Sequence, residues 1–378
     1  MKFIIQRNHL VDSVQDVMKA VSSRTTIPIL TGIKIVASEE GLTFTGSDSD
    51  ISIESFIPKE EAGDELVEIK ETGGIVLNAK FFGEIVKKLP MDTVEFEVVN
   101  HRQTIIKSGK AEFNLNGLDP DEYPHLPQIA EDKTFTIATD LLKSLIRQTV
   151  FAVSTSETRP ILTGVNWQIE NGLLVCTGTD SHRLARRSVP ITLDDSENVQ
   201  AVIPGKSLLE LSKILDDSND LVEIVITENQ ILFKSKHLLF FSRLLEGNYP
   251  DTSRLIPQES KTDITLHVKD FLHSIDRASL LARGERNNVV KLATLEGNSV
   301  EISSTTPEIG NVVEQVQCES ITGEELKISF SAKYMMDALK ALEDGDIVIS
   351  FTGAMRPFII RSVNDESILQ LILPVRTF

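Results

Sequence analysis

Residues 79–89 read AKFFGEIVKKL, and the same pattern returns as GKSLLELSKIL at 205–215 and as AKYMMDALKAL at 332–342. In each copy a lysine is followed by an acidic residue four positions later and by a second lysine seven positions later. Side chains with this spacing share one face of an α-helix, and the apolar residues fall on the opposite face. The sequence therefore predicts one amphipathic helix that occurs three times.

The residues around this helix are repeated as well. PILTG at 28–32 returns at 160–164, and TGSD at 45–48 returns as TGTD at 177–180, both with a shift of 132 positions. GNSVEI at 297–302 marks a third, more divergent copy. Alternating apolar and polar residues follow each helix and predict strands. Two independent matches at one shift indicate that the chain is built from repeats.

The limits of the repeats are marked by proline. Each repeat opens with a strand and a further helix, expected at 9–21, 141–151 and 271–281, and each closes on a strand. DEYP at 121–124 and GNYP at 247–250 follow the first two closing strands, and such residues favour linkers. We therefore expect an α+β protein of three similar sheet-rich domains with two helices each. Their predicted ranges are 1–125, 126–255 and 256–378.

Length and composition exclude several classes of protein. With 378 residues, the chain is too long for one core and suits two or three domains. Its amino-terminal apolar stretch is too short for a signal peptide, and no later run approaches a membrane span. Cys176 and Cys318 lack the spacing of a zinc site or a disulfide framework. We expect a soluble cytoplasmic protein with no cofactor and no metal.

The distribution of charge is more informative than its sum. The net charge of −18 by itself argues against nucleic-acid binding. However, the six predicted helices together carry +5, so the remainder carries −23. One interpretation is that lysine and glutamate are good helix formers on solvated faces. The other is a helical surface that faces phosphates without reading bases, inside an acidic exterior that repels DNA.

Two patterns could suggest an enzyme. Asp180 and His182 resemble part of a catalytic group, but no serine, cysteine or metal motif completes it. Asp48 and Asp50 could hold metal ions. Yet Asp48 is the repeat counterpart of Asp180, in a turn after a strand, where aspartate commonly forms the turn. We expect no catalytic activity. A β-rich scaffold indifferent to DNA is a third possibility, but it would not concentrate positive charge on helices.

Three motifs make the sequence similar to a known family. They are TDSHRL at 179–184, the opening MKF with PIL at 28–30, and the ending LPVR at 373–376. Over its whole length the chain resembles the β subunit of bacterial DNA polymerase III, the β sliding clamp family. The family usually has glycine where Ser181 stands.

The resemblance implies a function as a processivity factor. Two chains would join head to tail as a homodimer, and their six domains would form a ring with helices around the hole. Double-stranded DNA would pass through without sequence-specific contacts. The replicative DNA polymerase, the clamp loader and repair proteins would attach through short linear peptides, in the bacterial cytoplasm and at the nucleoid when the ring is loaded.

The resemblance also implies particular site residues. Phe113 and Leu115 of the first domain would meet Leu280 and Leu281 of the third across the dimer interface. The hydrophobic cleft for partner peptides would comprise Leu162, Thr179, His182, Arg183, Leu184, Pro250, Leu255, Tyr334, Ile372, Leu373, Pro374, Val375 and Arg376. Arg24 matches a DNA-contacting position of the family. The repeated helix pattern adds Lys80, Lys206 and Lys333 as further DNA-contacting candidates.

Overall fold

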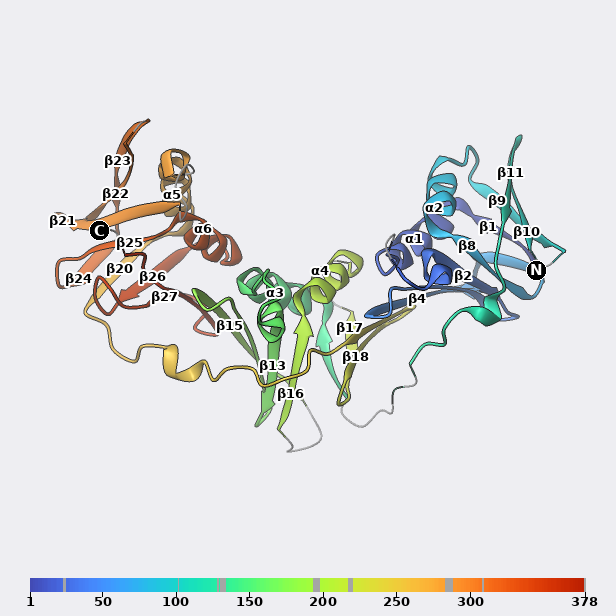
Figure 1. The fold of residues 1–378 in the computed structure, drawn as a ribbon, viewed down its shortest axis with the longest axis horizontal. Coiled ribbons are helices and arrows are strands. Elements are labelled where there is room, and N and C mark those ends of the chain that lie inside the picture. The colour runs from blue at the N-terminus through green and yellow to red at the C-terminus, as the bar shows by residue number, and fades with distance from the viewer. Residues whose placement is uncertain are drawn as a thin grey trace. The chain divides into compact units, whose positions relative to one another are not determined.

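The chain folds into two compact units in a computed structural model (Figure 1). The structure describes residues 1–22, 25–100, 102–127, 129, 134–192, 198–216, 220–282, 288–307 and 309–376. Unit 1 consists of residues 1–140 and 210–244, and unit 2 of residues 141–209 and 245–378. The middle repeat is thus divided between the units, because its strands belong to two different sheets.

Each repeat contains two α-helices within the described residues, so the predicted α+β fold class is confirmed. The opening helices are α1 (Arg7–Met18), α3 (Thr139–Thr149) and α5 (Val268–Ala282). The repeated pattern forms α2 (Ala79–Lys88), α4 (Gly205–Ile214) and α6 (Ala332–Ala341). Each opening helix begins two or three residues earlier than predicted, because the chain passes from strand to helix without a loop.

Two of the second helices, α2 and α6, begin at residues whose side chains cap the helix. Asn78 Oδ1 accepts a hydrogen bond from the amide of Phe81 at 3.3 Å, and Ser331 Oγ accepts one from the amide of Tyr334 at 3.4 Å. Such side-chain acceptors satisfy amide groups that have no partner within the helix. The capped helices then bury their apolar faces, which in α6 include Met335 and Leu339.

Unit 1 contains two main antiparallel sheets. The first runs in the order β11 (Ala111–Asn116), β10 (Gln103–Ser108), β9 (Thr93–Val99), β1 (Lys2–Gln6) and β7 (Val67–Glu71). The second runs in the order β12 (Thr134–Ala138), β17 (Leu221–Ile226), β18 (Gln230–Ser235), β19 (Leu238–Arg243), β4 (Ile51–Pro58), β3 (Gly41–Ser47), β2 (Gly32–Ala37) and β8 (Gly73–Asn78). A small hairpin joins β5 (Glu60–Glu61) to β6 (Asp64–Glu65).

Unit 2 has the same plan. Its larger sheet runs in the order β16 (Val199–Pro204), β13 (Gly164–Glu170), β14 (Leu173–Thr179), β15 (Arg183–Pro190), β28 (Ile368–Ile372), β27 (Phe358–Ser362), β26 (Asp346–Phe351), β20 (Thr262–His267) and β24 (Ser320–Gly323). The smaller sheet runs in the order β23 (Gly310–Gln317), β22 (Ser299–Thr306), β21 (Val289–Leu295) and β25 (Lys327–Ser331).

Neighbouring repeats are joined by one strand pairing. In unit 1, β4 of the first repeat pairs with β19, the closing strand of the second. In unit 2, β15 of the second repeat pairs with β28, the closing strand of the third. The register is the same: Arg243 N donates to Asp50 O, and Leu373 N donates to His182 O, both at 2.9 Å. We call these pairings the unit 1 joint and the unit 2 joint.

The counterparts of these strands at the two ends of the repeat series have a free edge. β23 is the third-repeat counterpart of β4 and β15, and β11 is the first-repeat counterpart of β19 and β28. Among the described residues, each pairs with a neighbour on one side only. A strand with an unpaired edge offers backbone donors and acceptors to another chain.

Apolar side chains between sheet and helices stabilise each repeat. In the first repeat the Phe3 and Phe96 rings stack with centroids 4.6 Å apart, and Phe82 meets Phe96 edge-on at 6.2 Å. In the third repeat, Phe358 lies between Phe351 and Phe330, with centroid separations of 5.0 and 5.8 Å. Aromatic pairs at these distances add stabilisation beyond the area they bury.

Two adjacent leucines of α4 provide a matched test of which face of this helix is packed in the core of the second repeat. Leu208 is 1% exposed and Leu209 is 45% exposed. We expect Leu208→Ala to lower the free energy of unfolding by about 2–5 kcal/mol, because a cavity replaces the buried side chain. Leu209→Ala should cost less than about 1 kcal/mol. Denaturant titration of both variants measures the difference, and equal losses would contradict the assigned face of the helix.

Candidate functional site

Arg183 lies at the centre of the unit 2 joint and is 8% exposed. Its Nε donates to Asp180 Oδ2 at 3.0 Å, Nη1 to Asp337 Oδ2 at 2.7 Å, and Nη2 to Phe151 O at 2.7 Å. The guanidinium carbon also lies 4.5 Å from the centroid of the Tyr334 ring. The side chain therefore connects the second repeat to α6 of the third, and two carboxylates compensate its buried charge.

The turn before Arg183 is held by its own side chains. Asp180 Oδ1 accepts hydrogen bonds from the amides of His182 and Arg183 at 2.9 and 3.1 Å. The Thr179 hydroxyl donates to Arg183 O at 2.5 Å. Ser181 has a φ of 78°, a conformation that favours glycine. The expected turn role of Asp180 agrees with this geometry.

Aromatic rings flank the buried arginine. The exposed His182 ring stacks on Tyr334, with a centroid separation of 6.4 Å and an interplanar angle of 19°. Burial raises the pKa of the Tyr334 hydroxyl, and the charge of Asp180 raises it further. The phenol therefore stays neutral at physiological pH, where it presents a flat, amphipathic surface.

An apolar cluster covers the neighbouring part of the joint. Leu184 is buried with Ile359, Leu369 and Leu371, and the partly buried Leu373 and Ile256 pack against them. Ile256 follows the short helix η5 (Ser253–Leu255), and the sequence analysis did not single it out. Ile372 points into the core of the third repeat. Beyond β28, Val375 N donates to Ser329 O at 2.8 Å, which holds the carboxyl-terminal segment near α6.

The structure therefore connects only part of the predicted peptide site through contacts. Thr179, His182, Arg183, Leu184, Tyr334, Ile372 and Leu373 belong to the unit 2 joint. Leu162 lies in a second cluster with Tyr249 and Val202. Pro250 and Leu255 are exposed on the segment between repeats, Pro374 and Val375 are half-buried, and Arg376 is exposed.

Asp337 forms an ion pair that the repeated helix pattern did not predict. It is the acidic member of that pattern, as are Glu84 in α2 and Glu210 in α4. Glu84 pairs with Lys88 at 3.4 Å and Glu210 with Lys213 at 2.8 Å, both within their own helices. Asp337 instead pairs with Arg183. The pattern identifies Asp337 as the acidic residue of the helix, but spacing along a helix does not identify a partner in another repeat.

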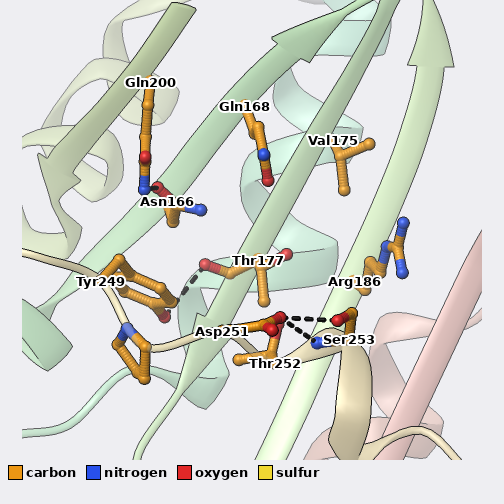
Figure 2. Close-up of a pocket in the computed structure, with 11 residues that line it drawn as sticks. Asn166, Gln168, Val175, Thr177, Arg186, Gln200, Tyr249, Asp251, Thr252 and Ser253 are labelled. Atoms are coloured by element: carbon orange, nitrogen blue, oxygen red, sulfur yellow. Dashed lines mark hydrogen bonds between the residues drawn. The ribbon is translucent and has the colours of Figure 1, made fainter.

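A cavity of about 250 Å³ lies on the same sheet face, beneath the segment that leads to η5 (Figure 2). We call it the unit 2 cavity, and no sequence pattern predicted it. Tyr249 and Asp251 hold the covering segment, because the Tyr249 hydroxyl donates to Thr177 O at 3.2 Å and Asp251 accepts from Ser253. The lining residues are Asn166, Gln168, Val175, Thr177, Arg186, Gln200, Tyr249, Pro250, Asp251, Thr252 and Ser253.

The residues predicted for the dimer interface lie on accessible parts of their units. Phe113 and Leu115 are half-buried on the free-edged strand β11. Leu280 is 58% exposed near the end of α5, and Leu281 is half-buried. Val313 on β23 is 59% exposed. Both free-edged strands are thus accompanied by accessible apolar side chains.

The residues predicted to contact DNA occupy one position in each repeat. Lys80, Lys206 and Lys333 are exposed in the first turn of α2, α4 and α6. Arg24 lies outside the described residues. With the observed helix bounds, the α-helices of the described chain carry a net charge of +4. The positive excess of the helices is therefore retained.

The described residues hold no group of three or more His, Cys, Asp or Glu side chains that could bind a metal ion. Both cysteines are buried and unpaired, and burial raises the pKa of the Cys318 thiol to about 11. No helix in the described ranges is long and apolar enough to cross a membrane.

Arg183 and Arg186, three positions apart on β15, allow a matched test of the joint. We expect Arg183→Met to lower the free energy of unfolding by about 3–5 kcal/mol, because Asp180 and Asp337 lose the cation that compensates them. Arg186 is half-buried, and among the described residues it has no ion pair, so Arg186→Met should cost less than about 1 kcal/mol. Equal effects in thermal or denaturant unfolding would show that the Arg183 contacts do not stabilise the joint.

Comparison with known proteins gives a consistent result along the chain. The N-terminal, central and C-terminal domains of the DNA polymerase III beta subunit match residues 1–127, 136–251 and 253–376. The chain is 69% identical to the beta sliding clamp of Bacillus subtilis and 52% identical to that of Staphylococcus aureus, with all of both chains covered in each case.

Solved structures agree with these matches. The crystal structure of the DNA polymerase sliding clamp from Bacillus subtilis is similar with a TM-score of 0.97, at 69% identity and full coverage of both chains. The beta chain from Streptococcus pneumoniae gives 0.95 at 41% identity, and a Pseudomonas aeruginosa sliding clamp bound to griselimycin gives 0.92 at 26%, both with full coverage. The chain therefore belongs to the bacterial DNA polymerase III beta subunit family.

Proposed function

We propose that two copies of this chain close into a ring around double-stranded DNA and hold the replicative polymerase on it. Family membership makes the chain a DNA sliding clamp, which is a processivity factor and not an enzyme. The ring, the contact surfaces and the partners below are our proposals. We place its three domains at 1–125, 126–255 and 256–378, on the repeat positions in the sequence.

The observation that carries the ring is the repeated strand pairing. β4 pairs with β19 and β15 with β28, whereas their counterparts β23 and β11 each keep a free edge among the described residues. A second copy would supply the missing partner to both edges. Head-to-tail contacts of this kind give a closed assembly when the rotation closes.

The two joints also fix the expected register between chains. Ile53 lies opposite Phe240 in the unit 1 joint, and Ala185 lies opposite Gln370 in the unit 2 joint. Their repeat counterparts are Val312 in β23 and Phe113 in β11. Val312 would therefore face Phe113 of the second copy. Paired residues point to one face of a sheet, so Leu115 would lie on the same face, toward Leu280 and Leu281.

Cross-linking tests this register. With Phe113 opposite Val312, the exposed Asn114 and Asn311 also lie opposite each other. Directly opposite residues have Cα atoms about 4.5–5.5 Å apart, which suits a disulfide. We expect the variant Asn114→Cys with Asn311→Cys to form a covalent dimer quantitatively on mild oxidation. The native cysteines are buried and should not interfere.

The control moves one cysteine along β11. Asn116→Cys with Asn311→Cys displaces the pair by two positions, about 7 Å, and should cross-link much more slowly. Denaturing electrophoresis distinguishes the outcomes. A ladder of higher oligomers would contradict closure by two chains, and equal cross-linking of both variants would contradict the register.

Charge supports DNA as the molecule inside the ring. α2, α4 and α6 carry net charges of +2, +1 and +1, whereas the whole chain carries −18. Lys80, Lys206 and Lys333 would face phosphates, and the acidic remainder would repel DNA from the outside. Arg24 joins them on the resemblance alone. Contacts limited to the backbone of DNA read no sequence, so the ring can slide.

A DNA circle tests enclosure. Clamp loaded on a closed circle by its clamp loader should remain bound for many minutes at about 0.5 M NaCl, because enclosure does not depend on ion pairs, and should dissociate within seconds once the circle is cut. Gel filtration of the labelled clamp, before and after cutting, measures retention. Equal retention on cut and uncut DNA would contradict enclosure.

Partner proteins would bind at the unit 2 joint. There Leu184, Tyr334 and Leu373 provide apolar and aromatic surface. Their repeat counterparts in the sequence are Ser52, Ser207 and Arg243, which are polar, and Ser52 and Arg243 flank the β4–β19 pairing of the unit 1 joint. The same backbone joint therefore provides an apolar peptide site only once per chain. We propose that the polymerase, the clamp loader and repair proteins use it in turn through short linear peptides, in the bacterial cytoplasm.

A further inference from the structure

The unit 2 cavity continues the proposed peptide site along one face of the sheet. Thr179 lies opposite Leu184 at the unit 2 joint, and the next pair on the same face, Thr177 opposite Arg186, lines the cavity. Successive pairs on one face are about 7 Å apart. Pro250, which the resemblance assigns to the peptide site, also lines the cavity.

The unit 2 cavity has a counterpart at the same position of the repeat in unit 1. Unit 1 has a cavity of about 290 Å³ at the equivalent place, and five of its lining residues are the counterparts of unit 2 cavity residues at a shift of 132. A Tyr-Pro pair begins the covering segment in both repeats, at Tyr123 and at Tyr249. Because both repeats have this cavity, the shape of the unit 2 cavity does not by itself indicate a ligand. The unit 1 cavity is lined by Lys34, Val36, Thr43, Thr45, Glu54, Pro124, His125 and Leu126.

The chemistry of the two cavities differs. In unit 1, Lys34 and Glu54 both line the cavity. Burial raises the pKa of Glu54, and the charge of Lys34 opposes this shift, so the two charges offset each other. In unit 2 their counterparts are the neutral Asn166 and the cationic Arg186. The acidic Glu54 of unit 1 is thus replaced by the cationic Arg186 in unit 2. The lysine that offsets Glu54 is replaced by the neutral Asn166, so nothing at that position offsets the charge of Arg186.

Arg186 keeps its donors available. Arg186 is half-buried, and its guanidinium has no hydrogen bond or ion pair among the described residues; Figure 2 draws it at the side of the cavity with no dashed line to another residue. The carboxylate of Asp251 is engaged with Ser253 and, at 3.6 Å, with Arg254. The Gln168 carboxamide has no hydrogen bond to a described residue either. The cavity therefore offers unused donors and one cation.

We propose that the unit 2 cavity receives an acidic side chain of the partner peptide, which pairs with Arg186. The peptide would lie extended over the sheet, with an apolar residue seated beside Leu184 and Leu373. In an extended chain, residues two apart point to the same side and lie about 7 Å apart, as Leu184 and Arg186 do. The acidic residue would thus be two positions from the apolar one. The proposal rests on the peptide site put forward above.

Paired peptides and a matched variant test it. The probe is a polymerase-derived peptide, made with either glutamate or glutamine two positions before its apolar residue, and in a second pair two positions after. For the wild-type chain, we expect the glutamate form of one pair to bind about five- to tenfold more tightly than its glutamine form. Arg186→Gln should abolish this preference and leave the affinity of the glutamine form unchanged. Calorimetry or fluorescence anisotropy measures these constants.

The control substitutes the counterpart cavity. Lys34→Gln in the unit 1 cavity should leave all four affinities unchanged, and the thermal transition of Arg186→Gln should match that of the wild type. Equal binding of glutamate and glutamine forms at both positions would overturn the proposal. So would an equal loss for both forms in Arg186→Gln, since Arg186 would then only shape the surface. If no peptide binds the wild-type chain, the proposed peptide site itself is wrong.

Discussion

Antiparallel pairing between the fourth strand of one repeat and the closing strand of the next is the constraint on which the structure depends. Without these joints, the fourth strand and the closing strand of each repeat would each have an unpaired edge, and such edges associate with other chains. The joints β4–β19 and β15–β28 remove one edge from each neighbour. Backbone hydrogen bonds form these joints, so the side chains at them can differ without loss of the pairing. At the unit 2 joint, the ion pairs of Arg183 add a side-chain connection that fixes α6 beside the turn at 180–182.

Because the repeated joint allows different side chains, one joint can carry the proposed peptide site while the other does not. Ser52 and Arg243 lie at the unit 1 joint in the positions that Leu184 and Leu373 hold at the unit 2 joint. The two cavities follow the same rule. Both are covered by a segment that begins with a Tyr-Pro pair, but Glu54 in one corresponds to Arg186 in the other. The two cavities therefore share their position in the repeat, whereas the chemical character of each depends on the individual residues that line it.

The distribution of charge suits a protein that stays on DNA without binding the phosphates tightly. In the proposed ring, the exposed lysines of the helices would attract phosphates weakly, and the large acidic excess elsewhere would limit contact with DNA from outside. Strong phosphate binding would slow sliding and depend steeply on salt. Topological enclosure, the proposed source of retention, requires neither many ion pairs nor base contacts.

The sequence by itself determined the repeats, the helix that defines them and the family. Those features depend on local periodicity and on motifs such as TDSHRL, which are read directly along the chain. It also predicted the turn role of Asp180. Only the tertiary structure decided which strands pair between repeats, that Asp337 compensates Arg183 and that Ile256 packs against the cluster of Leu184. It also showed a cavity beside the joint whose lining includes Arg186, which has no ion pair in the described part of the chain. The physical reason is that strand pairing and ion pairing join residues far apart in sequence. Asp337 follows Arg183 by 154 positions, and no local pattern specifies such a partner.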